Sequence, residues 1–179
     1  MTRVQGGEEQ LAGFISRYTP AIASQAVAIR AEMRKRYPTA IELVYDNYNA
    51  LAIGYGPTEK TSEAIFSIAL FPRWVSLFFL QARGLHDPHR ILQGSGKVAK
   101  HVVLASPDTL NQPEVATLMQ EAVARAKVMF DPEGAHRLII KSISQAQRPR
   151  RPAVEQVTRV ADGTTGTGRR KQTGAAVHP

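Results

Sequence analysis

Apolar residues recur at helical spacing in the first 36 residues of the chain. Thr19 and Pro20 divide this part in two, because Thr is a favoured N-cap and Pro is favoured in the first helical turn. We expect a short helix ending near Tyr18 and a longer one ending before Pro38, since proline disfavours helical geometry in the residue before it. The two apolar stripes are Leu11, Phe14, Ile15 and Tyr18, then Ile22, Ala26, Ile29 and Met33.

After Pro38 the pattern changes to runs of β-branched and aromatic residues separated by turn-forming residues, which is typical of strands. The third run carries apolar residues on both alternating faces, as expected of a central strand covered at least in part on both sides. Pro72 and Arg73 form a close connection between the third and fourth runs. The five predicted strands are 41–45, 50–55, 64–71, 74–80 and 101–105.

The remaining part of the chain predicts one more helix and then a loss of regular pattern. An amphipathic helix is expected over 114–128, and residues 138–143 suggest a further short element. Its type is undecided, with a helix or an irregular docked segment favoured over a strand. The fold class is therefore α+β, an antiparallel sheet of about five strands with N- and C-terminal helices packed on it. The expected organisation is a domain over 8–130, a docked extension over 131–147 and a disordered basic tail over 148–179.

Composition narrows the classes of function. The chain has 179 residues and no cysteine, which excludes disulfides, thiolate metal sites and cysteine nucleophiles. No run approaches the roughly 20 apolar residues that span a bilayer, and the first ten residues lack the basic and apolar pattern of a signal peptide. We therefore expect a cytoplasmic protein with no membrane contact.

The net charge of +8 is concentrated near the C-terminus. From Arg148 onward there are seven Lys or Arg residues and two acidic ones, which leaves only +3 on residues 1–147. This last segment contains no aromatic residue for base stacking, so at most non-specific nucleic-acid contact through the basic tail is expected. A tail without function is the alternative.

Five short motifs follow one another along the chain: Tyr37-Pro38, Val75 to Phe79, Asp87-Pro88, Leu92 to Lys97 and Lys100 to Leu104. Their order resembles the YdhG-like domain family of unknown function, over about residues 11–130. The resemblance implies a compact α+β sandwich similar to frataxin, and most members of that family are small cytoplasmic proteins without an assigned activity. It also implies a metal-handling alternative, because the family includes an intracellular iron chaperone.

The loop Gly94-Ser95-Gly96-Lys97 has the look of a phosphate-binding loop. A phosphate loop requires a glycine five positions before its Gly-Lys pair and a Ser or Thr after the lysine, where this chain has Ile91 and Val98. We interpret the loop as a tight turn between strand 101–105 and a helical turn that Asp87 begins. A weak anion or ligand contact by Ser95 and Lys97 is the alternative.

Asp46-Asn47-Tyr48-Asn49 is a polar cluster in an otherwise apolar hairpin region. Turn chemistry explains it, because Asn and Asp satisfy their own backbone and tolerate left-handed geometry. The alternative is a small pocket in which this cluster and residues near Trp74 meet a ligand. An enzymatic version of that pocket would place Asp46, Tyr48 and His101 together.

No motif assigns a reaction or a cofactor. His86 and His89 lie close together in the sequence, but two imidazoles need further converging ligands, so no metal site is predicted. The first helices carry more basic than acidic residues, whereas an exposed iron site prefers clustered oxygen ligands. We therefore expect a non-enzymatic module that binds an unidentified small ligand or protein, with metal handling and an enzyme near Asp46 and Tyr48 as alternatives.

Overall fold

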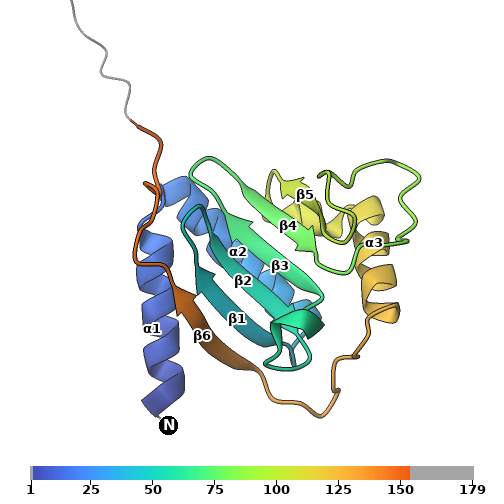
Figure 1. The fold of residues 1–179 in the computed structure, drawn as a ribbon, viewed down its shortest axis with the longest axis horizontal. Helices are drawn as coiled ribbons and strands as arrows, with labels where there is room; N and C mark the ends of the chain where they lie inside the picture. Colours follow the sequence, from blue (N-terminus) through green and yellow to red (C-terminus); the bar gives the residue numbers. More distant parts are fainter. Residues whose placement is uncertain (1, 154–179) are drawn as a thin grey trace, which may run out of the picture.

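A mixed β-sheet forms the centre of the molecule, as Figure 1 shows for the computed structural model, which describes residues 2–153. Within these residues the sheet has six strands in the order β5-β4-β3-β2-β1-β6. The strands are β1 (Ile41–Asp46), β2 (Leu51–Gly56), β3 (Phe66–Leu70), β4 (Val75–Phe79), β5 (Lys100–Leu104) and β6 (Arg137–Ile143). The helices are α1 (Thr2–Ser16), α2 (Pro20–Arg36), α3 (Pro113–Ala124) and the short 3₁₀ turns η1 (Thr61–Glu63) and η2 (Pro107–Asn111).

Helix α2 confirms the predicted second helix. The Thr19 hydroxyl accepts a hydrogen bond from the Ile22 amide, and Pro20 occupies the first helical turn. Its buried stripe is the predicted one and packs behind the sheet (Figure 1), with α1 beside β6 and α3 at the opposite side. Helix α1 begins at Thr2 and is longer than the predicted first helix, whereas α3 ends at Ala124, before the predicted end at 128.

Strands β1 to β5 form an antiparallel meander at the five predicted positions. In β3, Phe66, Ile68 and Leu70 belong to the core with α2, and the intervening Ser67 and Ala69 lie on the other face. The alternation in the sequence therefore sets which residues face α2.

No helix within residues 2–153 is long and apolar enough to cross a membrane.

The α+β class is confirmed, but the five-stranded antiparallel sheet is corrected. Residues 137–143 form a sixth strand, β6, which pairs with β1 in parallel and with a shift of register between Val44 and Tyr45. The chain reaches this edge by returning along the molecule after α3 (Figure 1), and a parallel partner so far away in the sequence leaves no local signal. The favoured expectation of a helix or irregular segment at 138–143 is therefore wrong.

Two further expectations change. Residues 87–92 form a turn instead of a helical turn, although the Asp87 carboxylate does accept hydrogen bonds from the Ile91 and Leu92 amides at 3.0 and 2.9 Å. Residues 148–153, assigned to the disordered tail, lie against the β1–β2 turn, where Arg150 is buried. The rest of the predicted tail, 154–179, lies outside the described residues.

Candidate ligand-binding site at the hairpin end of the sheet

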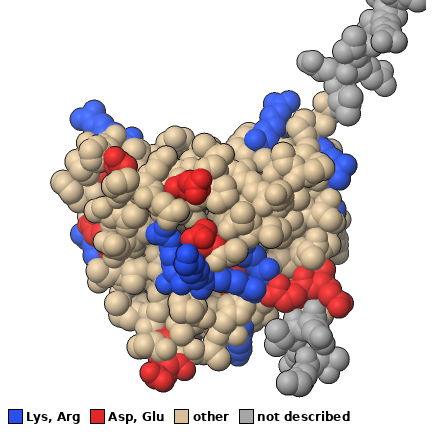
Figure 2. Space-filling model, turned by 180° about the vertical axis from the view of Figure 1, so that it is seen from behind, with Lys and Arg blue, Asp and Glu red and all other residues tan. Residues whose placement is uncertain are grey.

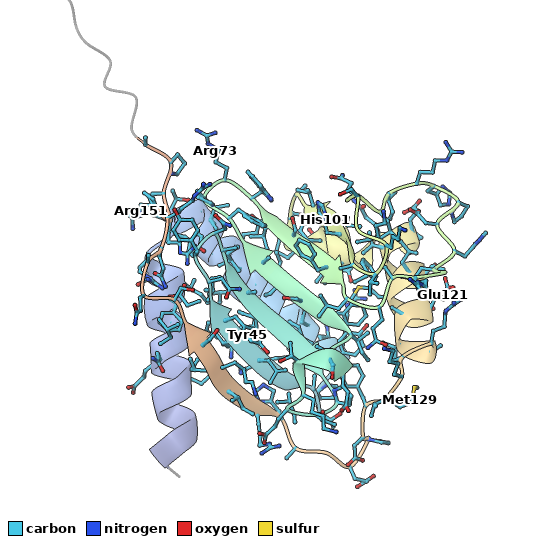
Figure 3. All side chains as sticks on the ribbon, viewed as in Figure 1. Tyr45, Arg73, His101, Glu121, Met129 and Arg151 are labelled. Carbon is cyan, nitrogen blue, oxygen red and sulfur yellow. The ribbon has the colours of Figure 1, made fainter. Side chains whose placement is uncertain are left out.

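Three segments that are distant in the sequence meet at one end of the sheet. Leu51 pairs with Leu70, so the β1–β2 turn and the β3–β4 turn lie at the same end. Strand β6 runs parallel to β1 and ends there too, opposite Asp46. The chain after β6 then runs beside the β1–β2 turn and lines one concavity together with the β3–β4 turn; Figure 3 labels Arg151 on the first segment and Arg73 on the second.

A concavity of about 590 Å³ opens between the two turns and the segment after β6. Its floor is aromatic, because the rings of Phe71 and Trp74 stack with centroids 5.0 Å apart and planes at 23°. Trp74 is 43% exposed, so part of this stack is open to solvent. The lining residues are Asn49, Phe71, Pro72, Arg73, Trp74, Arg148, Pro149, Arg151, Pro152 and Ala153.

The charge of the lining is positive. Three arginines contribute to it, and its described residues include no Asp or Glu. The guanidinium of Arg148 lies over the Tyr48 ring, 5.4 Å from the centroid, and that of Arg151 donates to the Arg17 and Tyr18 carbonyls at the end of α1. Within residues 2–153, neither Arg73 nor Arg148 forms an ion pair.

The predicted polar cluster is split by the structure. Asn49 and Trp74 line the concavity together, and Tyr48 lies under Arg148 at its side. Asn47 contributes its backbone carbonyl, which accepts a hydrogen bond from Arg150. Asp46 does not line the concavity: it is fully buried, and its carboxylate is bound by Arg17, Gln147 and Arg150.

His101 lies far from this cluster. It belongs to β5, four strand spacings from Asp46 on β1, or roughly 19 Å at about 4.8 Å per spacing. Its ring stacks on Phe78 with centroids 4.9 Å apart. The expectation of an enzyme pocket combining Asp46, Tyr48 and His101 is therefore wrong. His101 lies on β5, and three strands separate it from β1, which ends at Asp46.

Ser95 and Lys97 lie in a turn at the other end of the sheet. The turn folds back on β5, since Gln93 and His101 exchange two backbone hydrogen bonds of 2.7 and 2.9 Å. Gly94 has a φ of +108°, which favours glycine, and its carbonyl accepts a hydrogen bond from the Lys100 ammonium group. Both Ser95 and Lys97 are exposed, and neither belongs to the concavity at Trp74.

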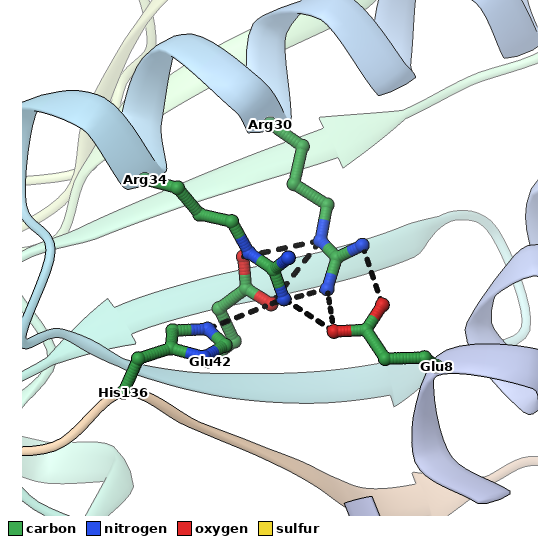
Figure 4. Close-up of polar contacts among 5 residues, drawn as sticks. All are labelled: Glu8, Arg30, Arg34, Glu42 and His136. Atoms are coloured by element: carbon green, nitrogen blue, oxygen red, sulfur yellow. Dashed lines mark hydrogen bonds and ion pairs between the residues drawn. The ribbon is translucent and has the colours of Figure 1, made fainter. Parts of the chain in front are cut away.

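A second buried carboxylate, Glu42, was not anticipated as a feature of the site or the core. Figure 4 shows it between Arg30 and Arg34 of α2, with Glu8 and His136 completing the network. Burial raises the pKa of Glu42, but the His136 imidazole 3.5 Å away, the hydrogen bonds from Arg30 and Arg34 and the charges of these guanidinium groups outweigh burial and lower the pKa to about 2. The sequence signal was an acidic residue at a core-facing position of a strand, Ile41-Glu42-Leu43-Val44.

This network joins α1, α2, β1 and the approach to β6. Arg30 donates to both oxygens of Glu42 at 3.1 Å and to both oxygens of Glu8 at 2.9 Å. Burial raises the pKa of Glu8 too, but the hydrogen bonds and charges of Arg30 and Arg34 lower it overall. Figure 2 shows basic and acidic side chains beside one another on the face behind the sheet, so this face is no single-sign patch.

Neither a metal-binding group among the described residues nor a similar known protein points to another site. Within residues 2–153, no three His, Cys, Asp or Glu side chains are grouped so that they would hold a metal ion. No family model, no curated protein and no solved structure matches the chain. The concavity at Trp74 is thus the candidate site because of its aromatic and arginine lining.

Proposed function

We propose that this chain is a non-enzymatic binding module of the YdhG-like class that holds a small organic anion in the concavity at Trp74. The observation that carries the proposal is the combination of an open aromatic stack with three arginines and no described acidic residue in one concavity. The cytoplasmic setting and the frataxin-like sandwich belong to this proposal through the resemblance of the motifs. The α+β sheet with α2 packed on one face supports it at the level of fold class.

The size of the concavity favours a small molecule over a polypeptide. Its volume of about 590 Å³ lies inside the range of roughly 300–1,000 Å³ that is usual for small-molecule sites. The exposed side of Trp74 suits a flat ring, because aromatic rings stack in offset geometry with favourable dispersion and quadrupole contacts. Arg73 and Arg148 suit a phosphate or carboxylate, which a guanidinium binds through two parallel hydrogen bonds. The expected ligand is therefore an aromatic ring with an attached anionic group.

The lining supports binding without catalysis. Among the described residues that form it there is no Ser, Thr, Cys, His, Lys, Tyr, Asp or Glu. General acid–base and nucleophilic catalysis need such side chains within hydrogen-bond reach of the reacting atoms. Arginine, tryptophan, phenylalanine and asparagine instead orient a ligand and compensate its charge.

The fluorescence of Trp74 gives a direct test, because it is the single tryptophan of the chain. We expect phenyl phosphate to change this fluorescence saturably, and inorganic phosphate to bind more weakly because it lacks the ring. Arg148→Gln should weaken phenyl phosphate about tenfold, as expected for loss of one charged hydrogen bond. The matched control is Arg83→Gln, an exposed arginine beyond the far end of β4, which should leave affinity unchanged.

Two outcomes would overturn the proposal. One is the absence of any saturable response to phenyl phosphate, benzoate and inorganic phosphate. The other is equal loss of affinity in Arg148→Gln and Arg83→Gln, which would show a diffuse charge effect without a site at Trp74.

A further inference from the structure

One wall of the concavity is a segment outside every helix and strand. Residues 147–152, here called the strap, follow β6 and cross the β1–β2 turn. Arg148 and Arg151 of the strap line the concavity, whereas Arg150 between them points inward and is 5% exposed. The strap therefore places two arginines in the lining of the concavity and buries the third.

Asp46 is the anionic partner of the buried arginine. One oxygen of its carboxylate lies 2.8 Å from Nη2 of Arg150, and the other accepts hydrogen bonds from Arg17 and, at 2.6 Å, from Nε2 of Gln147. Two other nitrogens of Arg150, Nε and Nη1, are buried without a hydrogen-bond partner in the described part of the chain. Since a buried guanidinium is very costly without a paired charge, the docked strap depends on Asp46.

The position of Arg150 sets the positions of its neighbours. Consecutive Cα atoms are about 3.8 Å apart, so Arg151 and, through Pro149, Arg148 have little freedom once Arg150 is fixed. The backbone of the strap is held as well, because the Arg148 amide donates to the Tyr48 carbonyl at 2.9 Å. Buried Arg150 thus holds Arg148 and Arg151 at the edge of the concavity.

We infer that Asp46 is a positioning residue for the anion site: by anchoring Arg150 it sets Arg148 and Arg151 against Trp74 and so builds one wall of the concavity. This inference rests on the proposed function. It replaces the role as a ligand contact that the sequence suggested for Asp46. Glu42 is equally buried on the same strand and is also bound by two arginines, but it forms no hydrogen bond or ion pair with the strap, so it provides the matched comparison.

Proteolysis tests the anchoring without a ligand. Trypsin cleaves poorly before proline, so the bonds after Arg148 and Arg151 resist it, and the bond after Arg150 is the one sensitive site within the strap. In the full chain we expect slow cleavage after Arg150, and cleavage about tenfold faster in Asp46→Asn, read by mass spectrometry under native conditions. Glu42→Gln should not accelerate this cut relative to cuts elsewhere in the folded domain. Equal acceleration of this cut in both variants, measured relative to cuts elsewhere in the folded domain, would refute the anchoring.

Affinity for phenyl phosphate tests the positioning. If Asp46→Asn leaves the strap docked for about a tenth of the time, the apparent affinity falls about tenfold. Arg150→Met should have the same effect, and the double variant should bind no more weakly than either single variant, because both act through one contact. Glu42→Gln should bind as wild type does.

The outcomes separate this inference from the proposed function. Absence of binding by wild type refutes the proposed function, and the anchoring is then decided by the trypsin cut alone. Binding by wild type with unchanged affinity in Asp46→Asn and Arg150→Met refutes the positioning role. Additive losses in the double variant refute it too, since they would mean that the two residues act separately.

Discussion

At the residue scale, the two buried carboxylates of β1 are neutralised by guanidinium groups. Glu42 lies near the start of the strand and Asp46 at its end, and each is bound by two arginines from other elements. A buried charge is tolerated only when paired and hydrogen-bonded, so each carboxylate requires its partners to be in place. The two clusters connect α1, α2 and the chain after α3 to β1.

The low pKa of Glu42 predicts a specific pH dependence of stability. Its folded pKa of about 2 lies below the ordinary value of 4.5, so its stabilising contribution is complete above about pH 4.5 and is lost as the pH falls through about 2. At pH 6, Glu42→Gln should reduce the free energy of unfolding by roughly 3–5 kcal/mol, as expected for breaking a buried ion pair. The difference from wild type should shrink steadily as the pH falls towards 2. Chemical denaturation at a series of pH values measures it.

Glu9→Gln is the control for this prediction, because Glu9 is exposed on the same helix as Glu8. It should change the free energy of unfolding by no more than about 0.5 kcal/mol at any pH. A Glu42→Gln effect that stays constant between pH 6 and 2 would contradict the prediction, since it would not depend on ionisation of the carboxylate.

At the element scale, one hydroxyl joins the helical corner to the sheet. Tyr18, between α1 and α2, is buried, and its hydroxyl donates to the Leu70 carbonyl at 2.9 Å and accepts from the Leu51 amide at 3.0 Å. Burial raises the pKa of Tyr18, so the hydroxyl stays protonated and keeps its role as donor. These two hydrogen bonds hold the connection between α1 and α2 against the start of β2 and the end of β3.

Tyr18→Phe should therefore destabilise the protein by about 1–3 kcal/mol, because it leaves a buried amide and a buried carbonyl without their partner. Thermal and denaturant unfolding measure the loss. Tyr48→Phe is the matched control, since that ring is 49% exposed and its hydroxyl forms no hydrogen bond within residues 2–153, so little change is expected. Equal stability of the two variants would refute the proposed importance of the Tyr18 hydroxyl.

At the scale of the whole molecule, the folded unit extends beyond the domain end expected at residue 130. Strand β6 completes the sheet at the β1 edge, and the strap buries Arg150 against Asp46. Three of the seven basic residues after position 147 thus have assigned contacts in the structure. Non-specific nucleic-acid contact by the remaining four, Arg159, Arg169, Arg170 and Lys171, stays a prediction and lies outside the described residues.

Truncation tests whether the residues after Gln147 belong to the folded unit. A chain ending at Gln147 loses Arg150 and should have a free energy of unfolding lower by roughly 3 kcal/mol than a chain ending at Ala153, because Asp46 keeps Arg17 but loses a buried partner. Both chains lack residues 154–179, so the comparison isolates residues 148–153, which include all of the strap except Gln147. Denaturant titration of the two proteins gives the difference. Equal midpoints would mean that the strap adds nothing to the stability of the fold.

Local patterns account for the elements that were predicted well. The stripe of α2, its Thr19 cap and the alternation in β3 depend on neighbours within a few residues, and such neighbours set both helical capping and the two faces of a strand. The same holds for the glycine turn at Gly94, where the absence of a side chain permits the positive φ. These features can be deduced without knowing where any distant segment lies.

Contacts across the fold decided the rest. The parallel partner of β1, the pairing of Arg150 with Asp46 and the meeting of Asn49 with Trp74 join residues that are 25 or more positions apart in the chain. Hydrophobic periodicity carries no information on which distant arginine meets a buried acid, because charge pairing depends on position in space and leaves no spacing in the sequence. Residue pattern alone established the α+β class, the meander and the helix faces. The tertiary structure showed that Asp46, a supposed ligand contact, is a buried partner of Arg150, and it placed the candidate site between two turns and the strap.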